Sequence, residues 1–397
     1  MKKNPDLKKI FQYDLDPSKI CRDLRLALNK KIEAKKTLLF IDEIQEEPRA
    51  ITALRYFYEE MPELHVIAAG SLVDFAIDQV GIPVGRIEFL YMYPMSFMEY
   101  LAAKGEKNLA IELVNHPPEE AINEAVHIKT LKLLGPYMAI GGMPAAMSQW
   151  IAREDIELCG KVLKNIKNAY EQDFSKYSKT HEIKYVELLF KQIPSIICEH
   201  FRFSNLATHF KKRDLEPSLH LLEKAGIVNQ IVKSVGDGIP LGAQADFNKF
   251  KLMLHDVGLT QAILGLDLKD WFIDPEAALI NKGRITESFV GQELLAYSNA
   301  SDKHRLYYWH REKRGAQAEV DYLIPSKHKI IPVKITNRHG ASLQSLRQFL
   351  ETHPQSDYGI RLSIHNYSVI QDLKSFPLYA VAGIVDNKER ILEFLSS

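Results

Sequence analysis

Residues Thr37–Glu43 read TLLFIDE, and this stretch predicts the fold of the N-terminal part of the chain. Leu38–Asp42 is an apolar run that ends in an acid, a pattern typical of a fully buried parallel strand. The run places two adjacent carboxylates, Asp42 and Glu43, at the carboxyl end of a strand, where ligands bind in open α/β sheets. Such a pair can hold Mg²⁺ and orient a water molecule, but a buried strand that runs into an acidic turn has the same pattern.

The residues after this stretch alternate between helical and strand patterns. Pro48–Met61 predicts a helix opened by a proline, with apolar residues at steps of three and four. Leu64–Ala69 predicts a second buried strand, and Ser71 follows it at a place suited to sensing a terminal phosphate. Ile87–Met92 predicts a third apolar strand. Together these elements predict a doubly wound α/β core.

Six stretches spread over nearly the whole chain carry a family resemblance. They are LLFIDEIQEEPRAITALRYFYEEMPELHVIAAGSL (Leu38–Leu72), PVGRIEFLYMYPMSFMEYL (Pro83–Leu101), IGGMPAAM (Ile140–Met147), YEQDFSKY (Tyr170–Tyr177), FKLMLHDVGL (Phe250–Leu259) and YYWHREKRGAQAEVDYLI (Tyr307–Ile324). In these stretches the chain resembles the prokaryotic AAA-type ATPases whose C-terminal half is a domain of unknown function. The resemblance implies an ATP-binding protein in which TLLFIDE is the Walker B element.

The resemblance also implies cofactors and site residues. The cofactors are Mg²⁺ and ATP. Asp42 would bind the nucleotide's metal as the Mg²⁺ ligand, and Glu43 would position the attacking water. Ser71 would sense the γ-phosphate.

Arg86 follows a glycine after the second predicted strand. In a ring or dimer of AAA-type ATPases, an arginine reaches the γ-phosphate of a neighbouring copy and stabilises transition-state charge. In that role Arg86 would make self-association part of the function. Alternatively, Arg86 pairs with Glu88 or Glu99 and orders its loop, and the sequence leaves both interpretations open.

The phosphate-binding loop of the family, G-x-x-x-x-G-K-[ST], precedes the Walker B strand, but residues 1–36 contain no glycine. No Gly-Lys-Ser or Gly-Lys-Thr triplet occurs elsewhere in the chain. The backbone N–H groups and the lysine of that loop provide most of the contacts to the β- and γ-phosphates. We therefore expect an N-terminally truncated core that lacks Walker A, and a possible partner in a separate N-terminal P-loop fragment.

Residues 186–265 predict a winged helix that follows a mainly helical lid. Basic residues Lys211, Lys212 and Arg213 precede its third helix, but Asp214 and Glu216 within that helix do not make a basic face. The domain therefore predicts either DNA contact or a role in joining domains and binding a partner. The elements expected here are helices Ile193–Phe203, Ser204–His209 and Asp214–Ala225, and strands Ile227–Val232 and Phe250–Leu254.

The C-terminal part carries a second set of charged residues. Glu287 lies on a predicted helix, and Asp321 lies with Glu319 on the predicted strand AEVDYLI. Lys334 lies on the next strand. A helix glutamate, a strand aspartate and then Glu-x-Lys on the next strand form the constellation of the restriction-endonuclease-like PD-(D/E)xK fold, whose carboxylates hold Mg²⁺. Family members commonly read Pro-Ile-Glu-Val-Lys where this chain has Lys334 and Thr336, so we expect a degenerate site with a Lys334–Asp321 ion pair and no nuclease chemistry.

Composition limits the possible functions. The 397 residues include 51 basic and 51 acidic side chains, which argues against bulk electrostatic binding of nucleic acid. The three cysteines, Cys21, Cys159 and Cys198, fit no metal spacing and indicate reduced thiols in a cytoplasmic protein. The N-terminus carries no apolar segment of the secretory type, and no run of about 18 apolar residues predicts a membrane span.

The sequence therefore predicts an α/β protein of four parts. Residues 1–93 form a truncated AAA-type parallel sheet, 94–185 a helical lid, 186–265 a winged helix, and 280–397 an α/β restriction-endonuclease-like domain. Two functions remain open. The chain is an AAA-type ATP-binding module coupled to its C-terminal region, or it is a non-catalytic scaffold that binds nucleic acid or protein.

Overall fold

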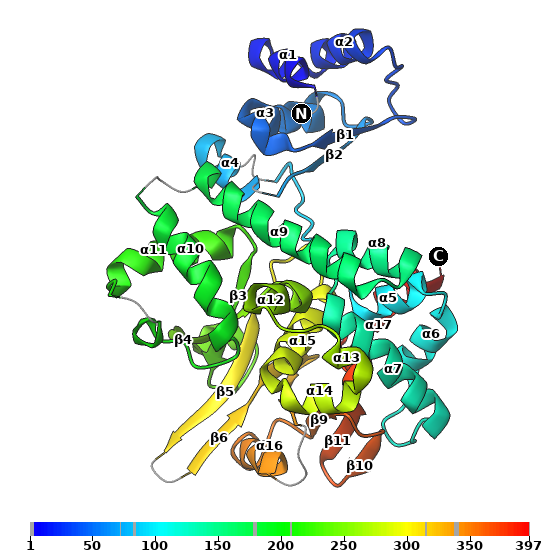
Figure 1. Cartoon of the computed structure of the whole chain (residues 1–397). Coiled ribbons are helices and arrows are strands. Elements are labelled where there is room, and N and C mark those ends of the chain that lie inside the picture. Colours follow the sequence, from blue (N-terminus) through cyan, green and yellow to red (C-terminus); the bar gives the residue numbers. More distant parts are fainter. Residues whose placement is uncertain are drawn as a thin grey trace. The chain divides into compact units, whose positions relative to one another are not determined.

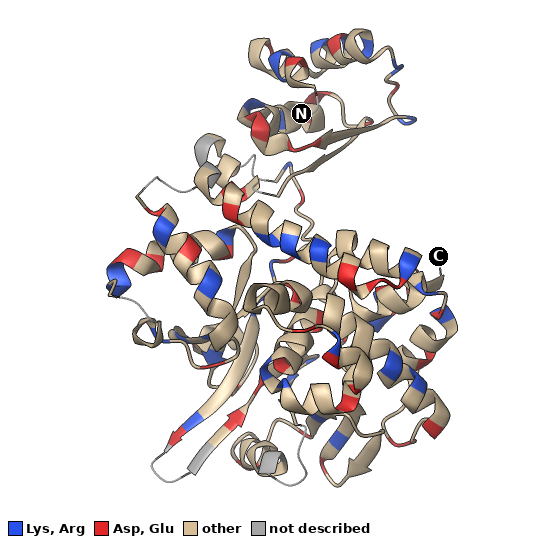
Figure 2. Ribbon diagram, viewed as in Figure 1, with Lys and Arg blue, Asp and Glu red and all other residues tan. Residues whose placement is uncertain are grey.

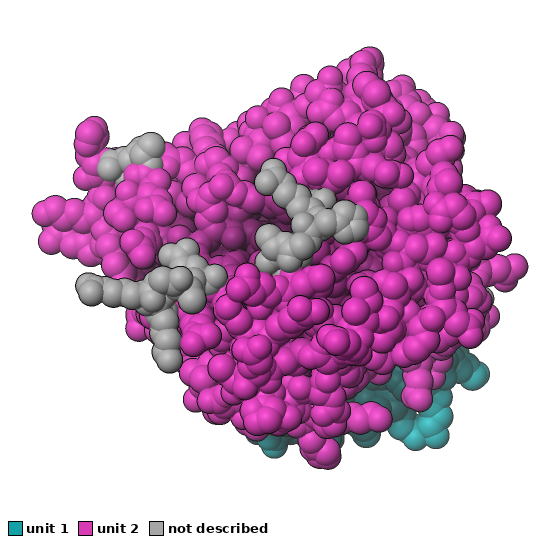
Figure 3. Space-filling model, turned by 90° about the horizontal axis from the view of Figure 1, so that it is seen from below, with its two compact units in different colours: residues 1–90 teal, residues 91–397 magenta. Residues whose placement is uncertain are grey.

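The computed structural model describes residues 4–71, 73–81, 85–177, 181–206, 209–313, 316–336 and 341–396 (Figure 1). The chain divides into two compact units, Met1–Leu90 and Tyr91–Ser397 (Figure 3). Separate clusters of buried apolar side chains form the interior of each unit. Each unit is therefore described by itself.

The first unit is built on a parallel pair of strands, β1 (Leu38–Asp42) and β2 (His65–Ala69). The helix between them, α3 (Pro48–Glu60), begins with a proline, and the side chain of Glu47 accepts a hydrogen bond from the Arg49 backbone N–H at its start. These three elements confirm the sequence-based prediction. The other helices of the unit are α1 (Lys8–Tyr13), α2 (Pro17–Leu28) and α4 (Val73–Val80).

The prediction that β1 is fully buried is wrong. Ile41 is buried, whereas Leu38 and Phe40 are 53% and 55% exposed, and Ile67 of β2 is 47% exposed. Successive side chains of a strand point to opposite faces, and the helices of this unit cover only the face that carries Ile41. The opposite face of the pair is apolar and accessible within the described part of the unit.

The third predicted strand, Ile87–Met92, is also wrong, because these residues have an irregular backbone. A strand exists only where a neighbour accepts and donates the hydrogen bonds of its ladder. Among the described residues, β1 and β2 pair only with each other. Apolar composition alone therefore does not make this segment a strand.

The second unit starts with helices, as the pattern of residues 94–185 predicts. Gly141, at φ +74°, ends α7, and the chain turns there into α8. The helices of the unit are α5 (Phe97–Ala103), α6 (Lys107–Asn115), α7 (Glu124–Ile140), α8 (Pro144–Arg153), α9 (Ile156–Tyr177), α10 (Ile183–Gln192), α11 (Lys212–Lys224), α12 (Val257–Leu264), α13 (Asp270–Ile273), α14 (Pro275–Asn281), α15 (Gly283–Ala296), α16 (Ala341–Thr352) and α17 (Lys388–Ser396).

Two sheets complete the second unit. The four-stranded sheet has the order β4-β3-β5-β6, and the five-stranded sheet has the order β10-β11-β9-β8-β7. Because β3 pairs in parallel with β5, one sheet joins residues that the sequence analysis divided between the winged helix and the C-terminal domain. The strands are β3 (Val228–Ser234), β4 (Ala245–Leu254), β5 (Leu306–Lys313), β6 (Ala316–Val320), β7 (Tyr322–Ser326), β8 (Lys329–Ile335), β9 (Gly359–Ser363), β10 (Ser368–Ile370) and β11 (Leu373–Pro377).

Three further predictions differ from the structure. The helix predicted over Ser204–His209 is, in its described part, only a 3₁₀ turn at Phe203–Asn205, and residues 207–208 lie outside the described residues. AEVDYLI does not form one strand, because the chain leaves the first sheet at the end of β6, bends at Asp321 and enters the second sheet as β7. The helix predicted over Ile193–Phe203 is replaced by a short 3₁₀ turn at Ile193–Ile196. Pro194 cannot donate a helical hydrogen bond, and Cys198 N–H instead donates to the Leu252 carbonyl of β4.

A buried carboxylate holds three helices of the second unit together. Glu293 of α15 accepts hydrogen bonds from the backbone N–H of Phe97 on α5, from the Tyr137 hydroxyl on α7 and from the Tyr297 hydroxyl. Burial raises the pKa of Glu293 to about 7, although these donors lower it in part. Within the described ranges, every helix is too short or too polar to span a bilayer.

Candidate functional site

Asp42, Glu43 and Ser71 lie at one edge of the first unit, which we call the acidic edge. Asp42 is the register partner of Ala69 in the parallel β1–β2 pair, so the carboxyl ends of both strands meet there. Ser71 follows β2 by two residues and is exposed, as is Asp42. The register thus places at one edge the strand ends that carry the three residues assigned by the sequence to metal, water and phosphate.

The backbone at the acidic edge turns sharply. Glu43 has a φ of +52°, in the left-handed region that residues other than glycine seldom adopt. Its backbone N–H donates to Asp42 Oδ1 over 3.0 Å. Glu43 thereby leaves the strand direction at its left-handed φ, and strained backbone of this kind is common at ligand sites.

Gln45 connects the ends of the two strands. Its Nε2 donates to Glu43 Oε2 over 2.5 Å, and its Oε1 is buried with no hydrogen-bond partner among the described residues. A Cβ on Gly70 would lie 2.0 Å from that Oε1 atom, so only glycine lets the Gln45 amide approach β2. Sequence reasoning missed Gln45, whose only signal was its place two residues after the acid pair.

Arg86 lies apart from the acidic edge. Its Nε donates to Glu59 Oε1 over 3.0 Å, and Arg55 donates to the same oxygen. Glu59 is near the last residue of α3, whereas the first residue of that helix follows the acid pair closely in the chain. A helix of 13 residues is about 20 Å long, so the Glu59–Arg86 pair lies at the opposite end of α3 from the acid pair. Glu59 is a partner of Arg86 that the sequence did not suggest.

The acidic edge fits one half of a Mg²⁺–ATP site. Two adjacent carboxylates and a hydroxyl offer the oxygen atoms that Mg²⁺ prefers. The phosphate half does not fit, because the 397 residues contain no G-x-x-x-x-G-K-[ST] sequence.

The second unit holds the residues of the predicted degenerate nuclease site. Lys334 Nζ lies 2.6 Å from Asp321 Oδ1, which confirms the expected ion pair. Asp321 is buried, and its Oδ2 accepts from the Ile335 backbone N–H over 2.8 Å. Burial opposes the charge of Lys334, but the Asp321 carboxylate outweighs it and raises the pKa of the lysine. Both oxygens of Asp321 are therefore engaged within the protein.

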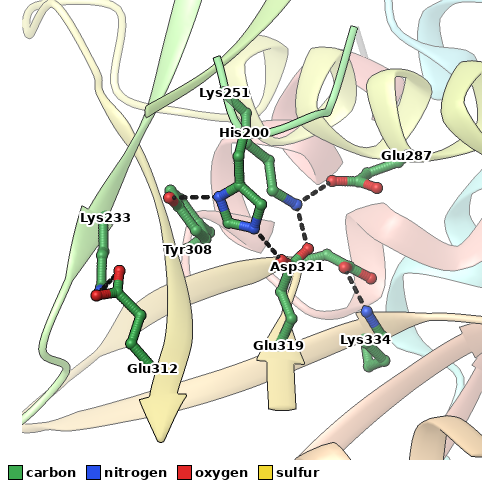
Figure 4. Close-up of polar contacts among 9 residues, drawn as sticks. All are labelled: His200, Lys233, Lys251, Glu287, Tyr308, Glu312, Glu319, Asp321 and Lys334. Carbon is green, nitrogen blue, oxygen red and sulfur yellow. Dashed lines mark hydrogen bonds and ion pairs between the residues drawn. The ribbon is translucent and has the colours of Figure 1, made fainter. Parts of the chain in front are cut away.

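Lys251 of β4 is a central residue that sequence reasoning missed. It is 1% exposed, and its Nζ lies 2.9 Å from Glu287 Oε1 and 2.6 Å from Glu319 Oε1 (Figure 4). Its signal in the sequence was a lysine inside the otherwise apolar run FKLML, which requires buried acceptors.

His200 extends this set of charges on the other side of Glu319. His200 Nε2 lies 2.7 Å from Glu319 Oε2, and His200 Nδ1 lies 3.1 Å from the Tyr308 hydroxyl (Figure 4). We call Lys251, Glu287, Glu319, Asp321, Lys334 and His200 the charge network. No pattern around His200 in the sequence pointed to this site.

Electrostatics keep the charge network paired. Burial raises the pKa of Glu287 to about 7, and the nearby Lys251 charge opposes this rise. Burial acts to raise the pKa of Glu319 as well, but the His200 hydrogen bond and the Lys251 charge outweigh burial and hold this pKa far below its usual range. Three carboxylates face two ammonium groups, so the network leaves little negative charge to hold Mg²⁺.

The predicted DNA-contacting helix carries mixed charges. On α11, Lys212 pairs with Glu216 over 3.2 Å, and Arg213 pairs with Asp214 over 3.6 Å. Figure 2 shows basic and acidic residues interspersed on this helix. Because acids offset the basic groups locally, DNA contact by α11 remains a prediction.

Comparison with protein families assigns three segments of the chain. Residues 2–101 match an AAA domain, residues 131–270 match a domain of unknown function (DUF8612), and residues 282–381 match another domain of unknown function (DUF4143). No curated protein matches the chain. The chain therefore has an AAA-type N-terminal domain followed by domains of unknown function, which agrees with the resemblance seen in the sequence.

Proposed function

We propose that the first unit is the metal-and-water half of an AAA-type ATP site. The observation that carries this proposal is the β1–β2 register, which sets Asp42 beside Ala69 and so brings Ser71 to the same edge. Asp42 would hold the Mg²⁺ of the bound nucleotide, and Glu43 would orient water toward the γ-phosphate. Ser71 would bond the γ-phosphate.

In this proposal a separate polypeptide supplies the phosphate-binding loop. The loop brings backbone N–H groups and a lysine that the acidic edge lacks. Without the loop, the chain binds Mg²⁺–ATP weakly and does not hydrolyse it. With the loop, the chain acts as a nucleotide-dependent switch for its C-terminal region.

Arg86 would act on a neighbouring copy. Its position near the last turn of α3, away from Asp42 of the same copy, suits an arginine that completes a site across an interface. Its pair with Glu59 is exposed, so exchanging this partner for a phosphate costs little.

A second candidate function is that of a binding scaffold without chemistry of its own. This function is favoured by the ion pairs of Lys334 with Asp321 and of Lys251 with Glu287, because they engage the carboxylates that would hold Mg²⁺ in a nuclease. In this form the region 280–397 keeps a nuclease-like fold and recognises nucleic acid or protein, and the winged helix adds contacts to the same partner. The three free, buried cysteines agree with a reducing, cytoplasmic location.

Manganese binding tests the acidic edge directly, because Mn²⁺ replaces Mg²⁺ on oxygen ligands and is seen by electron paramagnetic resonance. The full chain is titrated with Mn²⁺ in the presence of ATP. We expect Asp42→Asn to weaken Mn²⁺ binding at least about tenfold, since it removes one charged ligand. Glu60→Gln removes an exposed acid at the far end of α3 and serves as the matched control. Equal affinities in Asp42→Asn and Glu60→Gln would exclude the acidic edge as the metal site.

A further inference from the structure

We propose that His200, His310 and Glu319 form a binding site for a divalent transition-metal ion, Zn²⁺ in particular. One ligand atom from each of the three residues lies within 4.8 Å of the others. All three are in the second unit, so the proposal does not depend on the acidic edge or on ATP.

Two of the ligands are placed by the sheet. His310 on β5 and Glu319 on β6 are direct register partners in the antiparallel pair. Side chains of such partners project from the same face of a sheet and lie side by side. The rigid ladder thus fixes one imidazole next to one carboxylate.

The third ligand comes from a different segment that is fastened to the same sheet. His200 forms a bridge to Lys251 of β4, and the ring of His200 lies 4.7 Å from that of His310, centroid to centroid. His200 Nε2 is already 2.7 Å from Glu319 Oε2. Ligands around a tetrahedral Zn²⁺ are about 3.4 Å apart when each bond is about 2.1 Å, so small side-chain rotations suffice to admit the ion.

The surroundings of these ligands resemble the outer shell of a metal site. The second nitrogen of His200, Nδ1, lies 3.1 Å from the Tyr308 hydroxyl, which fixes the ring and leaves Nε2 facing Glu319 (Figure 4). The second oxygen of Glu319, Oε1, is held by Lys251, which leaves Oε2 for the ion. Such partners orient ligands before an ion arrives.

The ligand set also selects the class of ion. Two imidazoles and one carboxylate suit Zn²⁺ and neighbouring transition metals, whereas Mg²⁺ prefers oxygen alone. His200 is partly exposed, so an ion can enter from solvent. Three protein ligands leave the fourth position of a tetrahedral site to water. The ion would join the His200 segment to the β5–β6 hairpin and stabilise the second unit by mass action.

Cobalt binding to the full chain tests this site, because Co²⁺ replaces Zn²⁺ and its visible bands report nitrogen and oxygen ligands. We expect the metal-free chain to bind one equivalent of Co²⁺, which Zn²⁺ displaces. His310→Gln should weaken binding at least about tenfold, and Tyr308→Phe, which changes only the orientation of His200, should weaken it by about tenfold. Urea unfolding gives a second readout, since Zn²⁺ should raise the midpoint of the wild type but not of His310→Gln.

The matched control is His220→Gln on α11. His220 pairs with Glu223 over 3.1 Å, so it offers a surface His–Glu pair without a second histidine. The affinity of the His220→Gln variant for Co²⁺ should equal that of the wild type. The proposal is overturned if the wild type binds no stoichiometric Co²⁺, if His310→Gln binds it equally well, or if His220→Gln weakens binding as much as His310→Gln.

Discussion

Replacing Lys251 with methionine tests whether the charge network stabilises the second unit. The ammonium group is 1% exposed and pairs with Glu287 and Glu319, and methionine fills a similar volume without charge. Removing one partner of a buried ion pair leaves an uncompensated charge and costs about 3–5 kcal/mol. We expect a loss of this size in the free energy of unfolding at pH 8.

The loss should shrink at low pH. The pKa of Glu287 is already raised to about 7 in the folded chain, so its contribution to stability is present below about pH 4.5 and is lost as the pH rises through 7. Without Lys251 this pKa rises further, so the difference between wild type and variant grows with pH. At pH 5 Glu287 takes up a proton, and we expect the loss to be smaller by at least about 1 kcal/mol.

Urea unfolding followed by tryptophan fluorescence measures this effect, since Trp150, Trp271 and Trp309 all lie in the second unit. Lys249→Met is the matched control, because Lys249 lies two residues away on β4, is exposed and pairs only at the surface with Glu312. Lys249→Met should lower the free energy of unfolding by less than about 1 kcal/mol. A Lys251→Met loss below about 1 kcal/mol at pH 8, or one that does not change with pH, would refute the reasoning.

Two further predictions concern the helices of the second unit. The pKa of Glu293, raised to about 7, stabilises the folded chain below pH 4.5, and this contribution is lost above pH 7. Glu293→Gln should therefore reduce the change in unfolding free energy between pH 4.5 and pH 8 by about 3 kcal/mol. Unfolding free energies measured at these two pH values check this, and parallel profiles of wild type and variant would contradict it. A Cβ on Gly258 would lie 1.9 Å from the Ile140 carbonyl oxygen, so Gly258→Ala should cost about 3 kcal/mol. Gly160→Ala, whose Cβ meets nothing closer than 3.9 Å, should leave stability unchanged or raised, and an equal cost in both variants would show that close packing at Gly258 is not the cause.

The parts of the fold that depend on local sequence were predictable. The strands β1 and β2 and the helix α3 follow directly from an apolar run, a proline start and a helical period. Ile87–Met92 has the same apolar character as β1, but a strand also needs a neighbour to complete its hydrogen bonds, and no local pattern reports that neighbour.

The sites divide in the same way. The acid pair Asp42–Glu43 is adjacent in the sequence and was predictable, and the Lys334–Asp321 pair followed from a departure from the family pattern. The partners of Lys251 come from α15 and β6, and His200 reaches Glu319 across more than a hundred residues. Only the joining of β3 to β5 in one sheet brings these residues together, and no spacing in the sequence encodes that contact.

Calorimetric titration of the full chain with Mg²⁺–ATP tests the proposed ATP site most directly. The acidic edge provides metal ligands without a phosphate-binding loop, so we expect weak binding, with a Kd on the order of 1 mM. Binding should require Mg²⁺, disappear in Asp42→Asn and persist in Glu60→Gln. Binding of ATP that survives Asp42→Asn or the removal of Mg²⁺ would contradict the assignment of Asp42 as the metal ligand.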